Sequence, residues 1–210
     1  MPVACRSANT QEHHIEMANR FVISGDDASA AVEFEKALGI GRPNPRLQKV
    51  TGDCYARLKD YENAVKHYDA AVAILDNDLR KFEKMAAEEK DPGQQRLYRE
   101  IIETRIYPLL AEIYVAQARV YSSLGRQKKS SAALELALTC DEKNLAARLL
   151  FARSLEEKGD YKRALKEWTA FYALAIKTAR TEREAMGITD KEIAESKERI
   201  ADLLARQIQE

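Results

Sequence analysis

The side chains that most often carry out chemistry are few in this chain and poorly spaced for it. The cysteines Cys5, Cys54 and Cys140 show no Cys-x-x-Cys spacing and are odd in number, which argues against a zinc site and a disulfide framework. His13 and His14 are neighbours, so on a helix their side chains point roughly 100° apart and make a poor metal pair. We therefore predict no metal site.

The remaining candidates for catalysis are isolated. His67 has no second histidine near it in the sequence, and we expect the histidines to be solvated surface residues. Asp53 stands four residues before Arg57, a spacing that favours an ordinary ion pair on a helix over acid catalysis. The sequence contains no glycine-rich phosphate loop, no Gly-x-Ser-x-Gly and no His-Glu-x-x-His. We predict a protein without enzymatic activity, catalytic residues or cofactors.

Composition predicts a soluble, helical protein without a strong electrostatic field. The 210 residues are 45% hydrophobic, enough for a sizeable core, and include only 8 glycines and 5 prolines. The 34 Lys and Arg residues balance 34 Asp and Glu, so no global charge attracts nucleic acid. No apolar stretch could span a membrane, and we expect a cytoplasmic protein. The alternative is a trimmed bacterial lipoprotein, because Val3-Ala4-Cys5 is faintly similar to a lipobox.

A recurring pattern of small and large residues is the clearest signal in the sequence. In four segments a small residue is followed three positions later by a large one, which puts both on one helix face. These pairs are Ala18 and Phe21, Gly52 and Tyr55, Ala118 and Tyr121, and Ala152 and Leu155. Each pair is followed by a small residue, a bulky one and usually an alanine: Ala30, Phe34 and Ala37; Ala64, Tyr68 and Ala71; Ser130, Leu134 and Ala137; Ala164, Trp168 and Phe171. Small side chains let antiparallel helices approach closely, while bulky ones fill the space between them.

The spacing of these positions resembles that of the tetratricopeptide repeat. Equivalent residues are 34 apart from Ala18 to Gly52 and again from Ala118 to Ala152, the length of this repeat class. The likeness is closest from Gly52 to Ala71. It implies an all-α solenoid of antiparallel helix pairs.

We expect two repeat units over residues 11–78 and two over residues 111–178, separated by an insertion. Gly52 and Ala118 are 66 positions apart, 32 more than one repeat. Residues 79–110 hold two apolar helical stripes, and Asp91-Pro92-Gly93 breaks the chain between them.

Two arrangements of the insertion remain open. In the first, the chain bends at Asp76-Asn77-Asp78 and residues 79–110 form a degenerate fifth unit. In the second, a helix runs straight from Tyr61 to Lys90 and pairs with a long helix from Gln94 to Ser123 that is kinked at Pro108. Both put Asp91-Pro92-Gly93 at the tip of an antiparallel hairpin.

The two ends of the chain show different patterns. Residues 1–10 carry no periodicity, and we expect a flexible N-terminus. Over residues 179–210 the helical pattern first runs on to Gly187, and Thr189-Asp190-Lys191-Glu192 then predicts the capped start of another helix. One face of that helix is apolar, formed by Ile193, Ile200, Leu203, Leu204 and Ile208. We expect it to cap the array, because the terminal unit of a solenoid needs a polar outer surface.

The family resemblance also implies where a partner would bind. In tetratricopeptide-repeat proteins the first helices of the units line a concave groove that holds a peptide or a partner helix. Helical spacing puts the following side chains on the free faces of those helices: Ile15, Asn19, Lys49, Asp53, Arg57, Val115, Arg119, Leu149 and Arg153. The set is basic and apolar in part, so a segment with acidic residues and apolar anchors would fit.

From these features we expect an adaptor or scaffold that binds a partner protein in the groove. The alternatives are a chaperone-like assembly factor of a secretion, pilus or ciliary system, and a regulatory subunit of an enzyme. Apolar surface on the hairpin would suit a second partner or another copy of the chain, giving a homo-oligomer.

Overall fold

The computed structural model describes residues 10–207, and every regular element in that range is helical. In chain order the elements are α1 (Gln11–Ser24), α2 (Asp27–Ile40), α3 (Pro45–Arg57), α4 (Tyr61–Glu88), α5 (Pro92–Ile101), the π-helix η1 (Ile102–Ile106), α6 (Tyr107–Ser123), α7 (Gln127–Cys140), α8 (Leu145–Glu157), α9 (Tyr161–Ala175), α10 (Arg180–Ala185) and α11 (Asp190–Gln207). The predictions about Cys5 and Ile208 lie outside the described residues, as does the expected flexible N-terminus except for Thr10, whose side chain caps α1.

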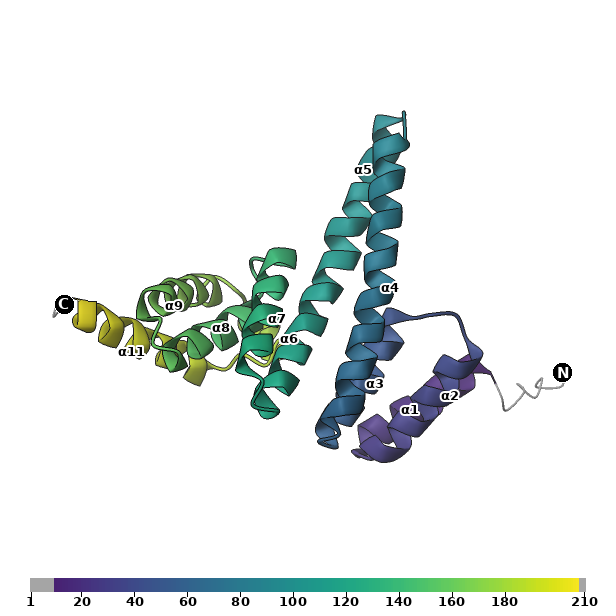
Figure 1. Cartoon of the computed structure of the whole chain (residues 1–210), viewed down its shortest axis with the longest axis horizontal. Helices are drawn as coiled ribbons and strands as arrows, with labels where there is room; N and C mark the ends of the chain where they lie inside the picture. The colour runs from purple at the N-terminus through teal and green to yellow at the C-terminus, as the bar shows by residue number, and fades with distance from the viewer. Residues whose placement is uncertain (1–9, 208–210) are drawn as a thin grey trace.

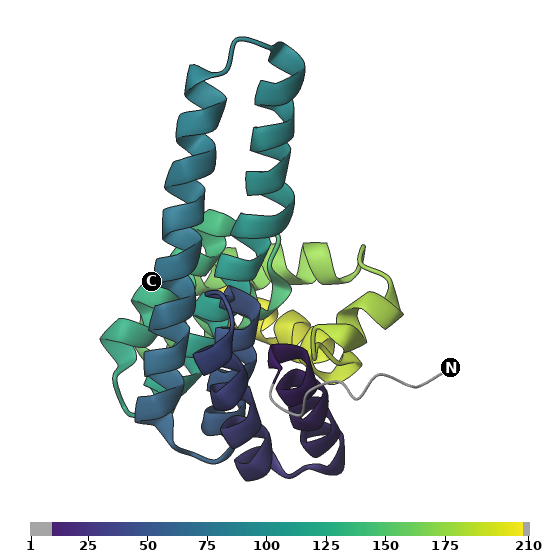
Figure 2. The same cartoon turned by 90° about the vertical axis from the view of Figure 1, so that its right-hand side faces the viewer.

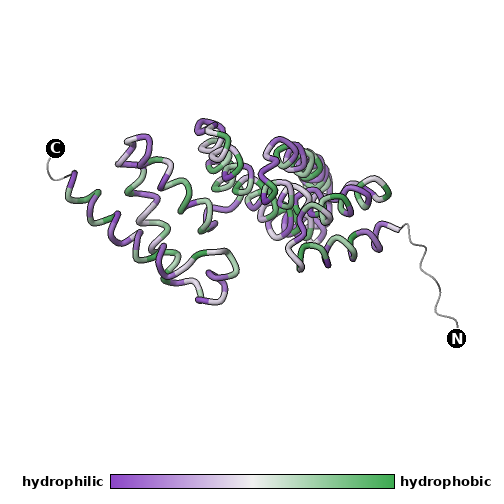
Figure 3. The backbone as a smooth tube through the Cα atoms, turned by 90° about the horizontal axis from the view of Figure 1, so that it is seen from below, coloured by the Kyte–Doolittle hydropathy of each residue, from purple (hydrophilic) through white to green (hydrophobic). Residues whose placement is uncertain are grey.

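Four helix pairs follow one another along an elongated array, with α1 and α11 near opposite ends (Figure 1). The pairs are α1 with α2, α3 with α4, α6 with α7 and α8 with α9, and each corresponds to one of the four predicted units. Hydrophobic and hydrophilic residues alternate along most of these helices (Figure 3), as expected for helices that bury one face. The predicted all-α solenoid is confirmed.

The small residues of the repeat lie where two helices cross. Eight of these alanines have no exposed surface: Ala18, Ala30, Ala37, Ala64, Ala71, Ala137, Ala152 and Ala164. The bulky positions are filled by Phe34, Tyr68, Leu134 and Trp168, and each of these side chains is at most 2% exposed. Ser130, which replaces alanine in the third unit, donates a hydrogen bond from its hydroxyl to the Ala118 carbonyl at 2.9 Å, so its polar atom is satisfied inside the core.

Gly52 stands at a close crossing of α3 and α4. A methyl group at its Cα would lie 2.7 Å from the Tyr68 ring and 3.2 Å from the Ala64 carbonyl oxygen. The Tyr68 hydroxyl donates a hydrogen bond to Asp53 at 2.8 Å, which holds the ring against α3. The close approach of the Tyr68 ring therefore favours glycine at position 52, where the other units have alanine.

The insertion is an extended hairpin and not a fifth unit. Helix α4 is continuous from Tyr61 to Glu88, with no bend at Asp76-Asn77-Asp78. It pairs with α5, η1 and the start of α6, and the hairpin rises away from the array (Figure 2). Sharing 32 extra residues between two helices adds roughly 24 Å of length at 1.5 Å per residue. The inner core of the second and third units continues into its base through Ile102, Ile106 and Leu109.

The returning helix is distorted just before Pro108, as predicted. The Tyr107 amide donates to the Ile102 carbonyl, five residues back, in place of the usual four. Proline lacks an amide hydrogen, and its ring crowds the carbonyl four residues earlier. A π-helical turn immediately before Pro108 accommodates both effects without ending the helix.

The C-terminal region departs from the predicted pattern in one respect. Helix α9 ends at Ala175 and does not run on to Gly187. Arg183 explains the break, because its guanidinium donates to the carbonyl groups of Ala175 and Thr178 at 3.1 and 3.0 Å and to Asp190 at 2.9 Å. These bonds satisfy carbonyl groups at the end of α9 and fold α10 back toward α11.

Helix α11 packs against α9 and covers the end of the array. Its start is capped as predicted, with the Thr189 amide donating to the Glu192 carboxylate at 2.7 Å. Leu203 is buried, and Ile193 and Ile200 pack against the same core. Leu204 is 46% exposed, so its assignment to the apolar face was wrong. The helix turns it away from α9.

Two histidines expected at the surface are buried. His14 pairs with Glu33 on the neighbouring helix. His67 on α4 stacks on the Tyr55 ring, and its ring nitrogens lie 2.7 Å from Gln48 Oε1 and 3.2 Å from Glu35 Oε1. These partners come from α2 and α3, so His67 joins the first two units. The surface assignment failed because helical spacing does not reveal how neighbouring units cover each other.

Replacing Gly52 with alanine should destabilise the protein. The added methyl group must displace the Tyr68 ring, and we expect a loss of about 1–2 kcal/mol in the free energy of unfolding. Urea denaturation followed by circular dichroism measures it. The matched control is Gly39→Ala in α2, where nothing lies within 4 Å of the added methyl group. That change should be neutral or stabilising by up to about 1 kcal/mol. If the two substitutions changed the free energy of unfolding equally, Gly52 would not lie at a close crossing of the two helices.

His67 should make stability fall at acidic pH. Burial lowers the pKa of His67 from its ordinary value of 6.5, against a smaller opposing effect of Glu35. The unfolded chain therefore binds the proton more readily, and stability is lost as pH falls through 6.5 toward the folded pKa. Denaturation of the wild-type protein and the His67→Gln variant from pH 7.5 to 5.0 tests this. The variant should lose less stability over that interval. A parallel decline would show that His67 contributes nothing to it.

Candidate protein-binding groove

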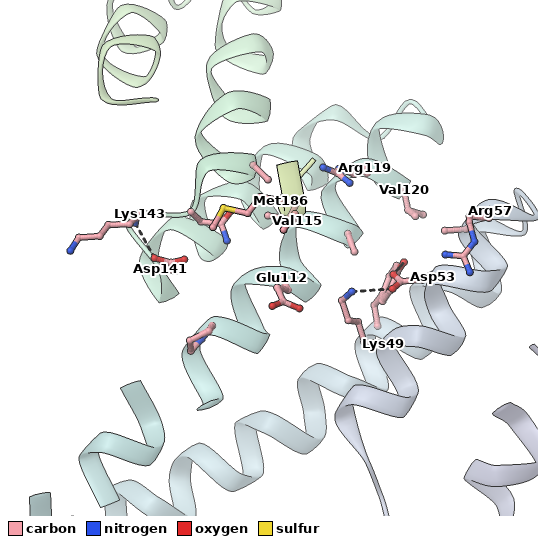
Figure 4. Close-up of a pocket in the computed structure, with 17 residues that line it drawn as sticks. Lys49, Asp53, Arg57, Glu112, Val115, Arg119, Val120, Asp141, Lys143 and Met186 are labelled. Carbon is pink, nitrogen blue, oxygen red and sulfur yellow. Dashed lines mark hydrogen bonds and ion pairs between the residues drawn. The ribbon is translucent and has the colours of Figure 1, made fainter. Parts of the chain in front are cut away.

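A cavity of about 670 Å³ opens on the face of the array between α3 and α6 (Figure 4). It is lined by Lys49, Asp53, Ala56, Arg57, Tyr68, Pro108, Glu112, Val115, Ala116, Arg119, Val120, Asp141, Lys143, Asn144, Ala146, Ala185 and Met186. We call this cavity the central groove. Its size is within the range of sites that hold small ligands or a short stretch of peptide.

Two first helices provide the walls of the groove. From α3 come Lys49, Asp53, Ala56 and Arg57, which repeat every three or four residues and so share one helix face. From α6 come Pro108, Glu112, Val115, Ala116 and Arg119, at the same spacing. The small side chains of Ala56 and Ala116 leave the space between the helices open.

The remaining walls come from the second half of the chain. Asp141, Lys143 and Asn144 lie on the turn between α7 and α8. Ala185 and Met186 stand at the end of α10, which Arg183 holds against α9 and α11. Met186 is 49% exposed and lies beside Val115 in Figure 4. The groove therefore requires the C-terminal segment as well as the repeats.

The charged groups on the α3 side are already paired. Lys49 Nζ lies 3.0 Å from Asp53 Oδ2, and the other oxygen of Asp53 accepts the hydrogen bond from Tyr68. Arg57 does not pair with Asp53 as predicted, because it binds both oxygens of Asp27 at 2.8 Å in the preceding unit. Burial, with the nearby Asp53 carboxylate, raises the pKa of Tyr68, so the phenol remains a hydrogen-bond donor at neutral pH. A ligand would meet little net charge along this wall.

The charged groups on the α6 side are open to a ligand. The side chains of Glu112 and Arg119 are exposed and make no ion pair or hydrogen bond with any residue between 10 and 207. The Lys143 ammonium is likewise unpaired within that range. Val115 and Ala116 lie between Glu112 and Arg119 on α6. This wall therefore presents an acidic group, an apolar patch and a basic group in order.

The structure gathers five of the nine predicted groove residues around this cavity: Lys49, Asp53, Arg57, Val115 and Arg119. The other four do not line it. Ile15 packs against the core of the first unit, and Asn19 is exposed on α1. Leu149 is 3% exposed in the C-terminal core, and Arg153 forms two bonds to Glu195 of α11, at 3.2 and 2.6 Å. Since α11 covers the last unit, the groove does not continue along α8.

Several lining residues were not among the predicted ones. Glu112 and Pro108 share the face of α6 with Val115, so helical spacing could have found them. Tyr68, Lys143 and Met186 come from other elements. No local pattern in the sequence links those residues to α3 or α6, because only the packing of distant segments brings them together.

Among residues 10–207 we looked for activated thiols and for clusters of metal ligands. Burial raises the pKa of Cys54 and of Cys140 to about 11, so both thiols are protonated at neutral pH. Within residues 10–207 no cluster of three or more His, Cys, Asp or Glu side chains could hold a metal ion. None of the helices described in this range is long and apolar enough to cross a membrane.

Comparisons with known proteins agree with this fold. A family model described as the tetratricopeptide repeat matches residues 52–74 and 111–144. No curated protein matches the chain in sequence. Among solved structures, a crystal structure of MamA has a TM-score of 0.61 at 15% identity, covering 81% of each chain.

Two further solved structures are similar in the same way. The structure of Pseudomonas aeruginosa pilF has a TM-score of 0.59 at 17% identity and covers 94% of this chain and 74% of its own. YrrB, described as a TPR protein with an unusual peptide-binding site, has a TM-score of 0.56 at 15% identity and covers 94% of this chain and 88% of its own. At these identities the similarity concerns the fold.

The repeat match falls on the second and third units, including the stretch from Gly52 to Ala71 in which the small and bulky positions are most regular. The helix pairs, their spacing and their buried alanines agree with it. Residues 52–74 and 111–144 of this chain therefore carry tetratricopeptide repeats, on a fold shared with solved proteins of that kind.

Proposed function

We propose that this protein is a cytoplasmic adaptor that binds a segment of a partner protein in the central groove. The observation that supports the proposal is the open cavity between α3 and α6, which has both apolar lining residues and unpaired charges on one wall.

The properties of the groove fit a peptide segment. Ala56, Val115, Ala116 and Met186 supply apolar contact surface, and methionine adapts readily to different side chains. Glu112 and Arg119 supply charged hydrogen-bonding groups that have no internal partner to displace. The similarity in fold to YrrB, whose description includes a peptide-binding site, is consistent with this use of the fold.

An assembly factor and a regulatory subunit are the alternative functions. The similarity to pilF is one of fold at 17% identity, and nothing in the groove selects for a pilus protein. Both alternatives would still bind another protein, so they differ from the adaptor in the identity of the partner.

The hairpin is a separate candidate contact surface. Leu97 on α5 is 46% exposed, while Ile102 and Ile106 face inward. Phe82 and Tyr98 pack against each other across the hairpin with ring centroids 6.2 Å apart. The hairpin thus buries most of its apolar side chains within itself. Its role in self-association stays a prediction, now centred on Leu97.

Reversing Arg119 should weaken binding of partners that use the groove. Arg119 is exposed and unpaired, so Arg119→Glu should leave the fold intact and reduce affinity about tenfold, the equivalent of one charged hydrogen bond. Partners recovered from a lysate by the wild-type chain would be purified and their affinities measured by biolayer interferometry. The control is Lys166→Glu, an exposed charge reversal on α9 outside the groove. Partners equally sensitive to both changes, or to neither, would contradict the groove proposal.

Self-association through the hairpin should depend on Leu97. If two copies pair at this surface, sedimentation velocity should show a dimer at high protein concentration and a monomer for Leu97→Glu. The matched control is Leu204→Glu, because Leu204 has the same 46% exposure but lies on α11. A monomeric wild-type protein at all concentrations would exclude this surface as a dimer contact.

A further inference from the structure

The charges of the central groove differ in whether they are already paired, and this difference bears on which ligands can bind. On α3, Lys49 is paired with Asp53, and Arg57 with Asp27. A ligand charge directed at any of them must compete with an existing partner. Glu112 and Arg119 on α6 have no such competitor among residues 10–207. Lys143 is also unpaired, but its ammonium points away from Glu112 and Arg119 in Figure 4, so these two side chains dominate the electrostatic recognition of a ligand.

The positions of Glu112 and Arg119 set a distance. They are seven residues apart on one helix, which is two turns, or about 10.5 Å along the axis. Val115 and Ala116 occupy the stretch between them, with Met186 facing the same cavity. A ligand that lies along α6 would place its base near Glu112, its acid near Arg119 and an apolar side chain in the middle.

The volume of the groove favours an extended ligand over a helix. An extended segment reaches both charges with about four residues, whereas a helix needs about eight, so the shorter segment suits a groove of about 670 Å³ better. An extended chain in the polyproline II conformation advances about 3.1 Å per residue with three residues per turn, so residues three positions apart lie on one face and span about 9 Å. That distance matches the separation of the two free charges.

We propose that the central groove recognises an extended segment in which an acidic and a basic residue stand three positions apart with an apolar residue between them. The inference rests on the proposed function and adds the chemical class of the partner segment. It adds a basic residue to the expected ligand with acidic residues and apolar anchors, because the basic residues of α3 are paired within the chain and Glu112 is free.

Selection of random displayed peptides on the full chain tests this inference. Peptides that bind the wild-type protein should be enriched in acid and base pairs three positions apart. Their affinities, measured by fluorescence polarisation, should fall at least tenfold for the double variant Glu112→Arg with Arg119→Glu. Exchanging the two charges in the peptide should restore binding to that variant. The double variant keeps the net charge and alters only exposed side chains.

A second variant separates this inference from the proposed function. Ala116→Trp, or Ala56→Trp if the first is unstable by thermal denaturation, fills the groove without changing its charge. Peptides that lose binding to the filled groove but are insensitive to the charge exchange would overturn the inference and leave the groove as the binding site. If no selected peptide responds to either change, both the inference and the proposed function are wrong.

Discussion

The close approach of antiparallel helices at alanine and glycine positions is the constraint on which the rest of this structure depends. Ala18 and Ala30 in the first unit, and Ala152 and Ala164 in the fourth, are fully buried in the same core clusters as the large residues of their units. Gly52 shows how little tolerance remains, since even a methyl group there would meet the Tyr68 ring. Repeating this contact at 34-residue intervals in each half of the chain, on either side of the insertion, generates the array.

The hairpin extends this packing arrangement and adds no new one. In a regular array the second helix of one unit packs beside the first helix of the next, as α4 and α6 do here. Both helices continue past the point where the chain would ordinarily turn, and Ile102 and Ile106 extend the core into the added part. The π-helical turn before Pro108 absorbs a proline that would otherwise interrupt the returning helix.

The position of the groove depends on which first helices are covered and on where the C-terminal segment packs. Helix α11 covers the last unit, where Arg153 bonds to Glu195, so the open surface is confined to α3, α6 and the segments beside them. Arg183 holds α10 in place and so brings Met186 to the edge of the cavity. Ion pairing on α3 leaves Glu112 and Arg119 on α6, with Lys143 at the edge of the groove, as the charges available to a partner.

The sequence alone determined the repeat. Its 34-residue period, alanines and aromatic positions reflect contacts between helices that are close together in the chain. The same periodicity predicted the free faces of α3 and α6, and with them Lys49, Val115 and Arg119. Only the tertiary structure decided that the insertion is a straight hairpin, that Leu149 is buried, that Arg57 binds Asp27, and that Met186 and Lys143 join the groove. These outcomes depend on contacts between segments far apart in the chain, and a helical period carries no record of which partner a charged or apolar side chain will meet.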